Sequence, residues 1–514
     1  MTARPGNRRL ARAGALAVAF VAGAAFLTAV ARHTRYGSSD NANALLAGQA
    51  MLRGNPLLRG WTMPHDSYWL LDLPLFGVAS VVAGLRDVLL AAVPAVVDAA
   101  AIVAGSTVAL LGRPPGRRGW VGAAVVAVLL GLPHPYLTIF VLQGPHHVAT
   151  AVVCLVAFGL LGGAGPGSGR WVAGTALLAV AAHSDPVAIA VGVVPVAAAG
   201  LLDGVRSRRL GAVAGPLAAA AGGLAGAFLL GLLLRLAGGY TVLPDPPAIG
   251  AWRENLPATP KILGGLLGVG GQGGLRGGSL VAHAIGAGLF AAGIAWSAFR
   301  SLAGLVRRRR STSAWLDDVL LLGFAGGVAL FALLTDPKLQ AVNARYLLPP
   351  LVFGAVLTAR RAIEVTARIP APALAAAGLA LGAAYLTTPL ATVRAPPPAN
   401  PAVAVADWLE ARGLQRGYGQ YWVAGLTTVS GRGGVAVRPV VAVDGRLRAS
   451  DHFASRRWFG GDRPFRFVVV DPVHPDGVDD AAAVTTFGPP AEARDVGPYR
   501  VLVWDRALGV APPP

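Results

Sequence analysis

Cysteine, lysine and acidic residues are scarce in this sequence. Of the 514 residues only one, Cys154, is cysteine, and only Lys261 and Lys338 are lysine. A lone cysteine excludes a disulfide framework and a cysteine-based metal site. Charged residues make up 13% of the chain, against roughly a quarter in ordinary soluble domains, whereas 54% of the residues are hydrophobic and the mean hydropathy is +0.58. These proportions exclude a single soluble globular enzyme.

The sequence contains many long apolar runs. A helix needs about 20 apolar residues to cross the hydrocarbon core of a bilayer. The sequence therefore predicts a mainly α-helical, polytopic membrane protein with about 11 spans. A shorter segment, 70–85, is interrupted by Asp72 and Pro74 and is expected to be re-entrant or to stay on the membrane surface. The long runs are 13–30, 88–111, 120–138, 146–163, 170–183, 186–202, 210–236, 279–299, 315–334, 346–360 and 371–390.

Arginine placement predicts the orientation of these spans. All but two of the 44 basic residues are arginine, and loops rich in basic residues stay in the cytoplasm. The arginines before the first run keep the N-terminus cytoplasmic. If 70–85 does not span alone, the later arginine clusters are cytoplasmic too; if it spans, they all lie outside. We adopt the first alternative, so membrane orientation explains the formal charge of +19, and nucleic acid is not an expected partner. The clusters are Arg113/Arg117/Arg118, Arg206/Arg208/Arg209, Arg307 to Arg310 and Arg360/Arg361.

Polar residues then gather on the outer side. Under this orientation every histidine, and most aspartates outside the C-terminal part, lies in an outer loop or in the outer part of a span. Titratable groups that accumulate on one side at membrane depth are typical of a site that opens to that side. We therefore expect the functional site on the outer face of a bacterial cytoplasmic membrane.

Two domains are expected. Residues 1–395 form the transmembrane helical domain, in which the outer loops 32–87 and 238–278 are too long to be simple connectors. After the linker RAPPPANP the composition becomes that of a soluble protein, which predicts a small extracytoplasmic α/β domain over 396–514. Its segment PAVAVADWLEARG is typical of a helix, and the segments 435–443, 465–471 and 499–505 are typical of strands.

Asp40 is the first candidate for chemistry. It lies near the start of SSDNANALLAGQAMLRG, whose apolar residues recur at helical spacing. This spacing predicts an amphipathic helix on the outer membrane surface. Ser38, Ser39 or Asp40 could cap the start of the helix, and capping would explain Asp40 structurally. The alternative is a general base that deprotonates an acceptor hydroxyl beside a membrane-held donor.

Further outer residues are suited to bind a sugar or an acceptor. The first loop combines histidine and aspartate with tryptophan and tyrosine, which fits either an interfacial aromatic belt or a wall for sugar rings. Capping before Pro186 is an alternative role for Asp185. A divalent metal is an open alternative for the histidine and aspartate groups, although no HxxxH or HExxH spacing occurs; no other cofactor is expected. The candidates are His65, Asp66 and Asp72 in the first loop and His146, His147, His183 and Asp185 in two short outer turns.

Basic residues in outer loops run against the positive-inside trend. Arg253 and Lys261 lie in the second long loop, and Arg345 and Tyr346 begin a late apolar segment in NARYLLPP. A basic side chain in such a place is a candidate for binding an anionic ligand. The alternative is that these side chains reach the lipid phosphates at the membrane surface.

The layout resembles the GT-C superfamily of polytopic glycosyltransferases, which take a sugar from a polyprenyl-phosphate carrier on the outer side of the membrane. The resemblance is carried by the first span followed by Asp40, the LPLFG segment followed by Arg86, a mid-chain outer loop with histidines, the NARYLLPPLVFG segment and a soluble C-terminal domain. It implies that Asp40 is the catalytic base or a metal-linked acid. It also implies that Arg345, and more weakly Lys261 and Arg253, contact the carrier phosphate.

One departure from the family pattern concerns metal binding. Members of the superfamily frequently carry an acidic pair in the first outer loop, whereas Asp40 is followed by Asn41. This leaves Asp66 or Asp72 as an alternative second acid. The resemblance further implies a polyprenyl-phosphate-linked sugar as donor, a glycan, lipid or protein as acceptor, and membrane lipids as surroundings.

Two other functions fit the same layout. A membrane transporter or flippase would place charges within spans, and Asp98 is the main charge of this kind. A non-catalytic envelope component would bind glycan through its C-terminal domain. Loss of transfer in an Asp40 variant would favour the glycosyltransferase over both.

Overall fold

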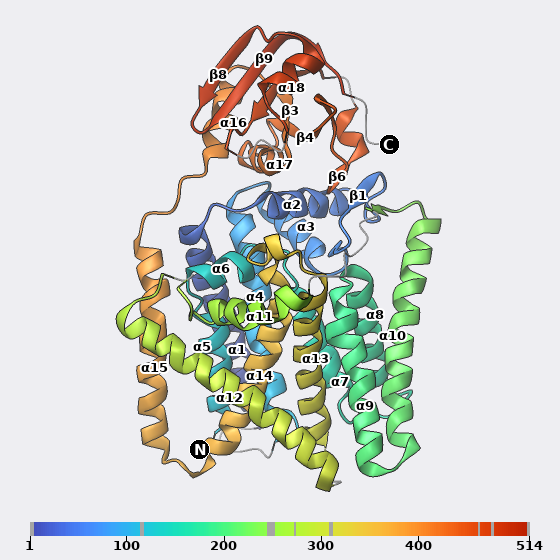
Figure 1. Cartoon of the computed structure of the whole chain (residues 1–514), viewed down its shortest axis with the longest axis vertical. Coiled ribbons are helices and arrows are strands. Elements are labelled where there is room, and N and C mark those ends of the chain that lie inside the picture. Colours follow the sequence, from blue (N-terminus) through green and yellow to red (C-terminus); the bar gives the residue numbers. More distant parts are fainter. Residues whose placement is uncertain are drawn as a thin grey trace. The chain divides into compact units, whose positions relative to one another are not determined.

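The computed structural model describes residues 5–113, 118–243, 252–271, 274–307, 312–460, 463–473 and 477–510. The chain forms two compact units (Figure 1). Unit 1 comprises Met1–Thr34, Pro94–Leu230 and Pro246–Pro396. Unit 2 comprises Arg35–Val93, Gly231–Asp245 and Pro397–Pro514, so most of the first long loop belongs with the C-terminal residues.

The apolar runs are helical, and the mainly helical membrane fold is confirmed. In the described part of the chain, 8 helices are long and apolar enough to cross a membrane, or up to 9 if α5 and α6, bent by 93° at a break rich in proline, form one span. Two further apolar runs give shorter helices, α7 and α8. The helices are α1 (Pro5–Thr34), α4 (Val88–Leu110), α5 (Gly119–Gly131), α6 (Pro135–Val141), α7 (Val148–Leu161), α8 (Gly169–Ser184), a π-helical turn (Ile189–Val193) leading into α9 (Val194–Ser207), α10 (Leu210–Leu236), α12 (Gly277–Arg307), α13 (Thr312–Leu334), a 3-10 turn (Val342–Leu347) leading into α14 (Leu348–Val365), and α15 (Ala371–Arg394).

Helix α14 is the central helix of unit 1. Every residue from Leu348 to Arg361 is buried, and α14 packs against α5, α7, α12 and α13. A glycine lets α12 approach α14 closely, because a Cβ at Gly293 of α12 would lie 2.6 Å from the Thr358 hydroxyl oxygen. Small residues at helix contacts are the usual means of packing helices in a membrane. The buried guanidinium group of Arg360 is paired with Asp317, which satisfies its charge within the helical bundle.

The first long loop folds into helices α2 (Ser39–Leu52) and α3 (Asp72–Ala83) of unit 2. The prediction of a helix near Asp40 is confirmed, but its expected amphipathic character is wrong. Ten of its fourteen residues are buried, including the polar Asn41 and Asn43, because α2 packs against α3 and, on another side, against α17 (Tyr421–Ser430). Helix α3 has 12 residues and a length of about 18 Å, too short to cross a hydrocarbon core alone.

The C-terminal residues form a six-stranded mixed sheet with helices, as the sequence predicted for an α/β domain (Figure 1). The strand order is β5-β4-β3-β7-β9-β8, and the central strands β4, β3 and β7 are parallel. Strands β3, β5 and β8 and helices α17 and α18 were not predicted. The elements are α16 (Pro401–Ala411), β3 (Arg416–Gln420), β4 (Ala436–Val443), β5 (Arg446–Ala449), β7 (Phe465–Val470), α18 (Asp480–Phe487), β8 (Glu492–Val496) and β9 (Tyr499–Leu508).

A second, three-stranded sheet connects distant parts of unit 2. Its order is β2-β1-β6, with β1 (Trp61–Met63) from the first long loop, β2 (Thr241–Val242) from the second and β6 (Ala454–Ser455) from the C-terminal part. Backbone pairing across such sequence separations fixes the first loop to the C-terminal residues of this unit.

We expect Gly48→Ala to destabilise unit 2. A Cβ at Gly48 would lie 2.4 Å from the Leu73 carbonyl oxygen and 2.6 Å from the Gly77 backbone nitrogen, so α2 and α3 would have to separate. Overpacking of this kind costs about 1–3 kcal/mol. Thermal unfolding of the detergent-solubilised protein should show a lower Tm than the wild type. The matched control is Gly288→Ala in α12, where a Cβ meets nothing within 4 Å; an equal loss in both variants would contradict the proposed α2–α3 contact.

Candidate active site

Asp40 lies in the first turn of α2, and Ser38 caps that helix. The Ser38 hydroxyl oxygen accepts a hydrogen bond from the Asn41 backbone nitrogen at 3.3 Å. The capping explanation for Asp40 is therefore wrong. The half-buried Asp40 carboxylate accepts a 2.6 Å hydrogen bond from the hydroxyl of Tyr421. This bond joins the first long loop to the C-terminal part of unit 2.

Tyr421 was not among the site residues predicted from the sequence. It directly follows β3 and begins α17, which lies close to α2 because Gly425 has no side chain: a Cβ there would be 2.7 Å from the Asn43 amide oxygen. The Tyr421 ring also packs edge-on against His452, with centroids 4.9 Å apart. A tyrosine after an unpredicted strand carries no motif, so only the packing of α17 on α2 identifies it.

Further polar groups lie at the same edge of the sheet. Asp471 directly follows β7, and its backbone nitrogen donates to the Gln420 side chain at 3.4 Å. Burial, together with the nearby Tyr36 hydroxyl and Asp471 carboxylate, raises the pKa of Tyr499 to about 12. Ligands of open α/β sheets bind beyond the carboxyl ends of the parallel strands, which is the edge where β3 leads into Tyr421 and β7 into Asp471.

The other first-loop candidates do not bond to Asp40. Asp66 accepts a 2.9 Å hydrogen bond from the Tyr68 hydroxyl. Asp72 is buried in the first turn of α3, and His65 is exposed. Asp66 and Asp72 therefore remain predictions as a second acid.

A second group of predicted residues meets inside unit 1. The Nδ1 of His147 and the carboxylate of Asp185 are 2.7 Å apart, and both side chains are fully buried. The Thr150 hydroxyl donates to the same Asp185 oxygen. His147 stacks on Tyr346 with centroids 4.9 Å apart, and the Arg345 guanidinium carbon lies 5.4 Å from the Tyr346 ring centre. The structure thus brings together four candidates from three separate loops.

The backbone of His147 is unusual. Its φ of 58° lies in the left-handed region, which costs a residue with a Cβ free energy and is common at functional sites. Asp185 orients the imidazole through Nδ1 and also accepts a 3.1 Å hydrogen bond from the Val187 backbone nitrogen. The capping role predicted for Asp185 and its role as a candidate site residue are therefore both compatible with the structure.

Four other candidates belong to unit 1. His146 interacts through Nδ1 with the Phe140 carbonyl oxygen at 2.8 Å, and His183 is half-buried in the last turn of α8. Arg253 and Lys261 are exposed on α11 (Trp252–Leu266), a helix inside the second long loop. Asp245 and His474, which the sequence placed on the outer side, lie outside the described residues.

Metal ions in proteins are held by groups of several ligand side chains. Among the described residues, no group of three or more His, Cys, Asp or Glu side chains could hold a metal ion. The His147–Asp185 pair supplies two ligand types, but its aspartate is already bonded to Thr150 and Val187. We therefore assign no step of the reaction to a metal.

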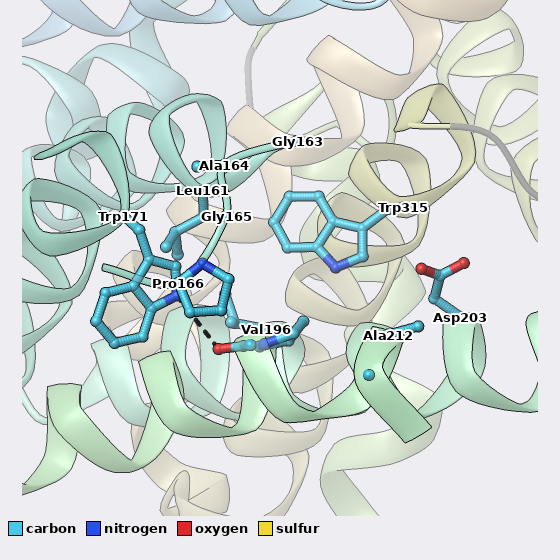
Figure 2. Close-up of a pocket in the computed structure, with 13 residues that line it drawn as sticks. Leu161, Gly163, Ala164, Gly165, Pro166, Trp171, Val196, Asp203, Ala212 and Trp315 are labelled. Carbon is cyan, nitrogen blue, oxygen red and sulfur yellow. Dashed lines mark hydrogen bonds between the residues drawn. The ribbon is translucent and has the colours of Figure 1, made fainter. Parts of the chain in front are cut away.

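Among the cavities that the described residues of unit 1 form, two are considerable in size. The larger, of about 910 Å³, is an almost entirely apolar groove between α5, α12, α14 and α15, lined among others by Trp120, Val281 and Leu381. The smaller, of about 560 Å³, is shown in Figure 2 with Trp171, Asp203 and Trp315 in its wall; the Trp171 indole nitrogen donates to the Gly215 carbonyl oxygen at 3.3 Å. Neither cavity is lined by a residue that the sequence analysis proposed for the site.

No protein-family model matches the chain, and no curated protein is similar to it in sequence. Among solved structures, two crystal structures of ArnT from Cupriavidus metallidurans are similar. The one bound to undecaprenyl phosphate is 15% identical with a TM-score of 0.58, over 95% of this chain and 97% of ArnT. The apo structure is 15% identical with a TM-score of 0.55, over 96% and 98%. The archaeal oligosaccharyltransferase AglB from Archaeoglobus fulgidus aligns at 12% identity and a TM-score of 0.46, over 88% of this chain and 69% of AglB.

The chain therefore has a fold similar to that of ArnT over nearly its whole length. This likeness agrees, at the level of the fold alone, with the resemblance inferred from the sequence, and the predicted polytopic helical membrane fold is confirmed. At these identities the likeness assigns no individual residue.

Proposed function

We propose that the protein is a glycosyltransferase that moves a sugar from a polyprenyl-phosphate carrier to an acceptor on the outer side of the cytoplasmic membrane. The proposal is supported by the ArnT-like fold over nearly the whole chain, together with a first-loop carboxylate that is held by Tyr421 instead of capping its helix. The undecaprenyl phosphate bound to the similar ArnT supports a carrier of this class.

The proposed reaction assigns separate roles to Asp40 and to Arg345. In unit 2, Asp40 takes the proton of the acceptor hydroxyl as its oxygen forms a bond to the anomeric carbon of the sugar. The bond between that carbon and the phosphate oxygen breaks, and the polyprenyl phosphate leaves with the electron pair. In unit 1, Arg345 stabilises the departing phosphate by charge, and His147 is oriented beside it through Asp185 and Tyr346. The apolar groove of unit 1 suits the isoprenoid chain.

The remaining expectations stay part of the proposal. The N-terminus is cytoplasmic, and residues 396–514 are extracytoplasmic. Lys261 and Arg253 are secondary candidates for the carrier phosphate. The candidates for contacts with sugar or acceptor are His65, Asp66, Asp72, His146 and His183.

Reconstitution tests this function. Purified protein in lipid nanodiscs, given a polyprenyl-phosphate sugar, should bind the carrier and release polyprenyl phosphate when a sugar acceptor is added. Failure to bind the carrier would contradict the proposal. Uptake of a polar substrate into liposomes would instead favour a transporter, for which Asp98 is the relevant residue: it is 1% exposed in α4, and its Oδ2 has no partner among the described residues.

We expect Tyr421→Phe to lower kcat about tenfold, the effect of one charge-assisted hydrogen bond, with KM nearly unchanged. Phenylalanine keeps the ring packing on His452 but removes the donor to Asp40, so the carboxylate loses its fixed orientation. The matched control is Tyr240→Phe, which deletes another phenolic hydrogen bond of unit 2, the 2.9 Å bond with Ser67. Equal kinetics in the two variants would show that Tyr421 has only a structural role.

A further inference from the structure

Two arginines of the C-terminal sheet lie on one face without a carboxylate partner. Arg438 of β4 pairs in register with Tyr418 of β3, and Arg416 precedes Tyr418 by two residues, so the side chains of Arg416 and Arg438 lie on the same face. Arg416 donates to the carbonyl oxygens of Trp458, Gly460 and Arg463 at 2.7–3.0 Å. Within the described residues Arg438 donates no hydrogen bond, and its Nε is buried without a partner.

Aromatic rings surround these guanidinium groups. The Arg438 guanidinium carbon lies 4.6 Å from the Trp458 ring centre, and Trp458 meets Trp61 edge-on at 4.8 Å. Trp458 is half-buried, whereas Arg457 beside it is exposed. Trp61, Arg438, Arg457 and Trp458, with Arg416 behind them, are here called the Arg438 patch.

The charge balance of the Arg438 patch favours an anion. Burial and repulsion by Arg416 lower the pKa of Arg438 to about 9. The guanidinium group therefore remains positive at neutral pH, but its charged form is destabilised. Stacking on Trp458 gives Arg438 a packing role, but packing alone does not neutralise its buried positive charge. A bound phosphate or carboxylate would offset it and would accept hydrogen bonds from the guanidinium group.

We propose that the Arg438 patch binds an anionic sugar, a glycan that carries carboxylate or phosphate groups. Arginine recognises the anion by paired hydrogen bonds, and a tryptophan face or edge supplies apolar area against a sugar ring. The Arg438 patch belongs to unit 2, which also holds Asp40. That this glycan is the acceptor rests on the proposed function; the binding itself does not.

The test is binding of galacturonic acid tetrasaccharide to the full-length protein in zwitterionic nanodiscs, measured by calorimetry without any carrier lipid. We expect Arg438→Gln to weaken binding about tenfold, the loss of roughly one charge-assisted contact, and the exposed Arg457→Gln about threefold by loss of one surface charge. The matched control is Arg494→Gln on β8, which removes the same charge from an exposed position of the same sheet and should leave binding unchanged.

Three outcomes would overturn the proposal. Equal binding of the methyl-esterified, uncharged tetrasaccharide would rule out anion recognition, and equal binding of inorganic phosphate would rule out recognition of the sugar. Equal weakening by Arg494→Gln would show unspecific attraction. If Arg438→Gln does not fold, Arg457→Gln and the esterified probe still decide. Because no carrier is present, failure here leaves carrier turnover intact, and failure of the proposed transferase leaves this binding intact.

Discussion

Replacing Asp40 by asparagine should lower kcat for sugar transfer about a thousandfold, within the range that a general base contributes. Asparagine cannot take a proton from the acceptor hydroxyl. Its side-chain oxygen can still accept the hydrogen bond from Tyr421, and the Ser38 cap of α2 is independent of position 40. The variant should therefore fold and bind the carrier normally. Release of polyprenyl phosphate from a polyprenyl-phosphate sugar, followed under single-turnover conditions, measures the loss.

The matched control for Asp40→Asn is Asp66→Asn. Asp66 also belongs to unit 2 and also accepts a hydrogen bond from a tyrosine hydroxyl, that of Tyr68. As a contact for sugar or acceptor, Asp66 should affect KM and leave kcat within about threefold. If Asp40→Asn keeps its activity, Asp40 is not the base. If Asp66→Asn alone abolishes transfer, the base is Asp66.

Replacing Arg345 by alanine should lower kcat/KM about a hundredfold. A guanidinium group beside a departing phosphate stabilises charge that develops in the transition state, and one such contact contributes about 3 kcal/mol. Arg345 is half-buried and lies over Tyr346, which continues into the buried His147–Asp185 pair. The loss should appear both in carrier binding, measured with polyprenyl phosphate, and in turnover.

Arg253→Ala is the matched control for this second prediction. Arg253 also lies 5.4 Å from the ring centre of a neighbouring aromatic residue, Trp252, but it is exposed on α11 and belongs to no buried group. We expect its removal to change kcat/KM by less than about threefold, as for an exposed charge. Equal losses in the two variants would mean that the second long loop shares the phosphate site.

Much of the fold could be read from local sequence. Apolar runs of spanning length became helices, and the three predicted strands and one predicted helix of the C-terminal part became β4, β7, β9 and α16. Hydropathy and residue periodicity are properties of neighbouring residues, so they need no knowledge of the rest of the chain. The exception was α2, whose predicted amphipathic surface became buried because α3 and α17 cover different sides of it.

The candidate site could be predicted only in part. His147, Asp185, Arg345 and Tyr346 were proposed from their residue types and loops, but the sequence assigned them to two different roles, and the structure brings them together. Arg253 and Lys261 had the same sequence signature as Arg345 but are exposed on α11. A loop sequence states which side chains are present, whereas their meeting depends on how several helices pack.

The sequence by itself determined that this is a polytopic membrane protein with a small α/β part, because the free energy of burying an apolar run in lipid depends on that run alone. Only the tertiary structure decided that Ser38 caps α2 and that Tyr421 donates a hydrogen bond to Asp40, which lies 381 positions earlier in the chain. The bond exists because Gly425 lets α17 approach α2 closely. Contacts of this kind depend on backbone geometry across the whole of unit 2, which no local pattern encodes.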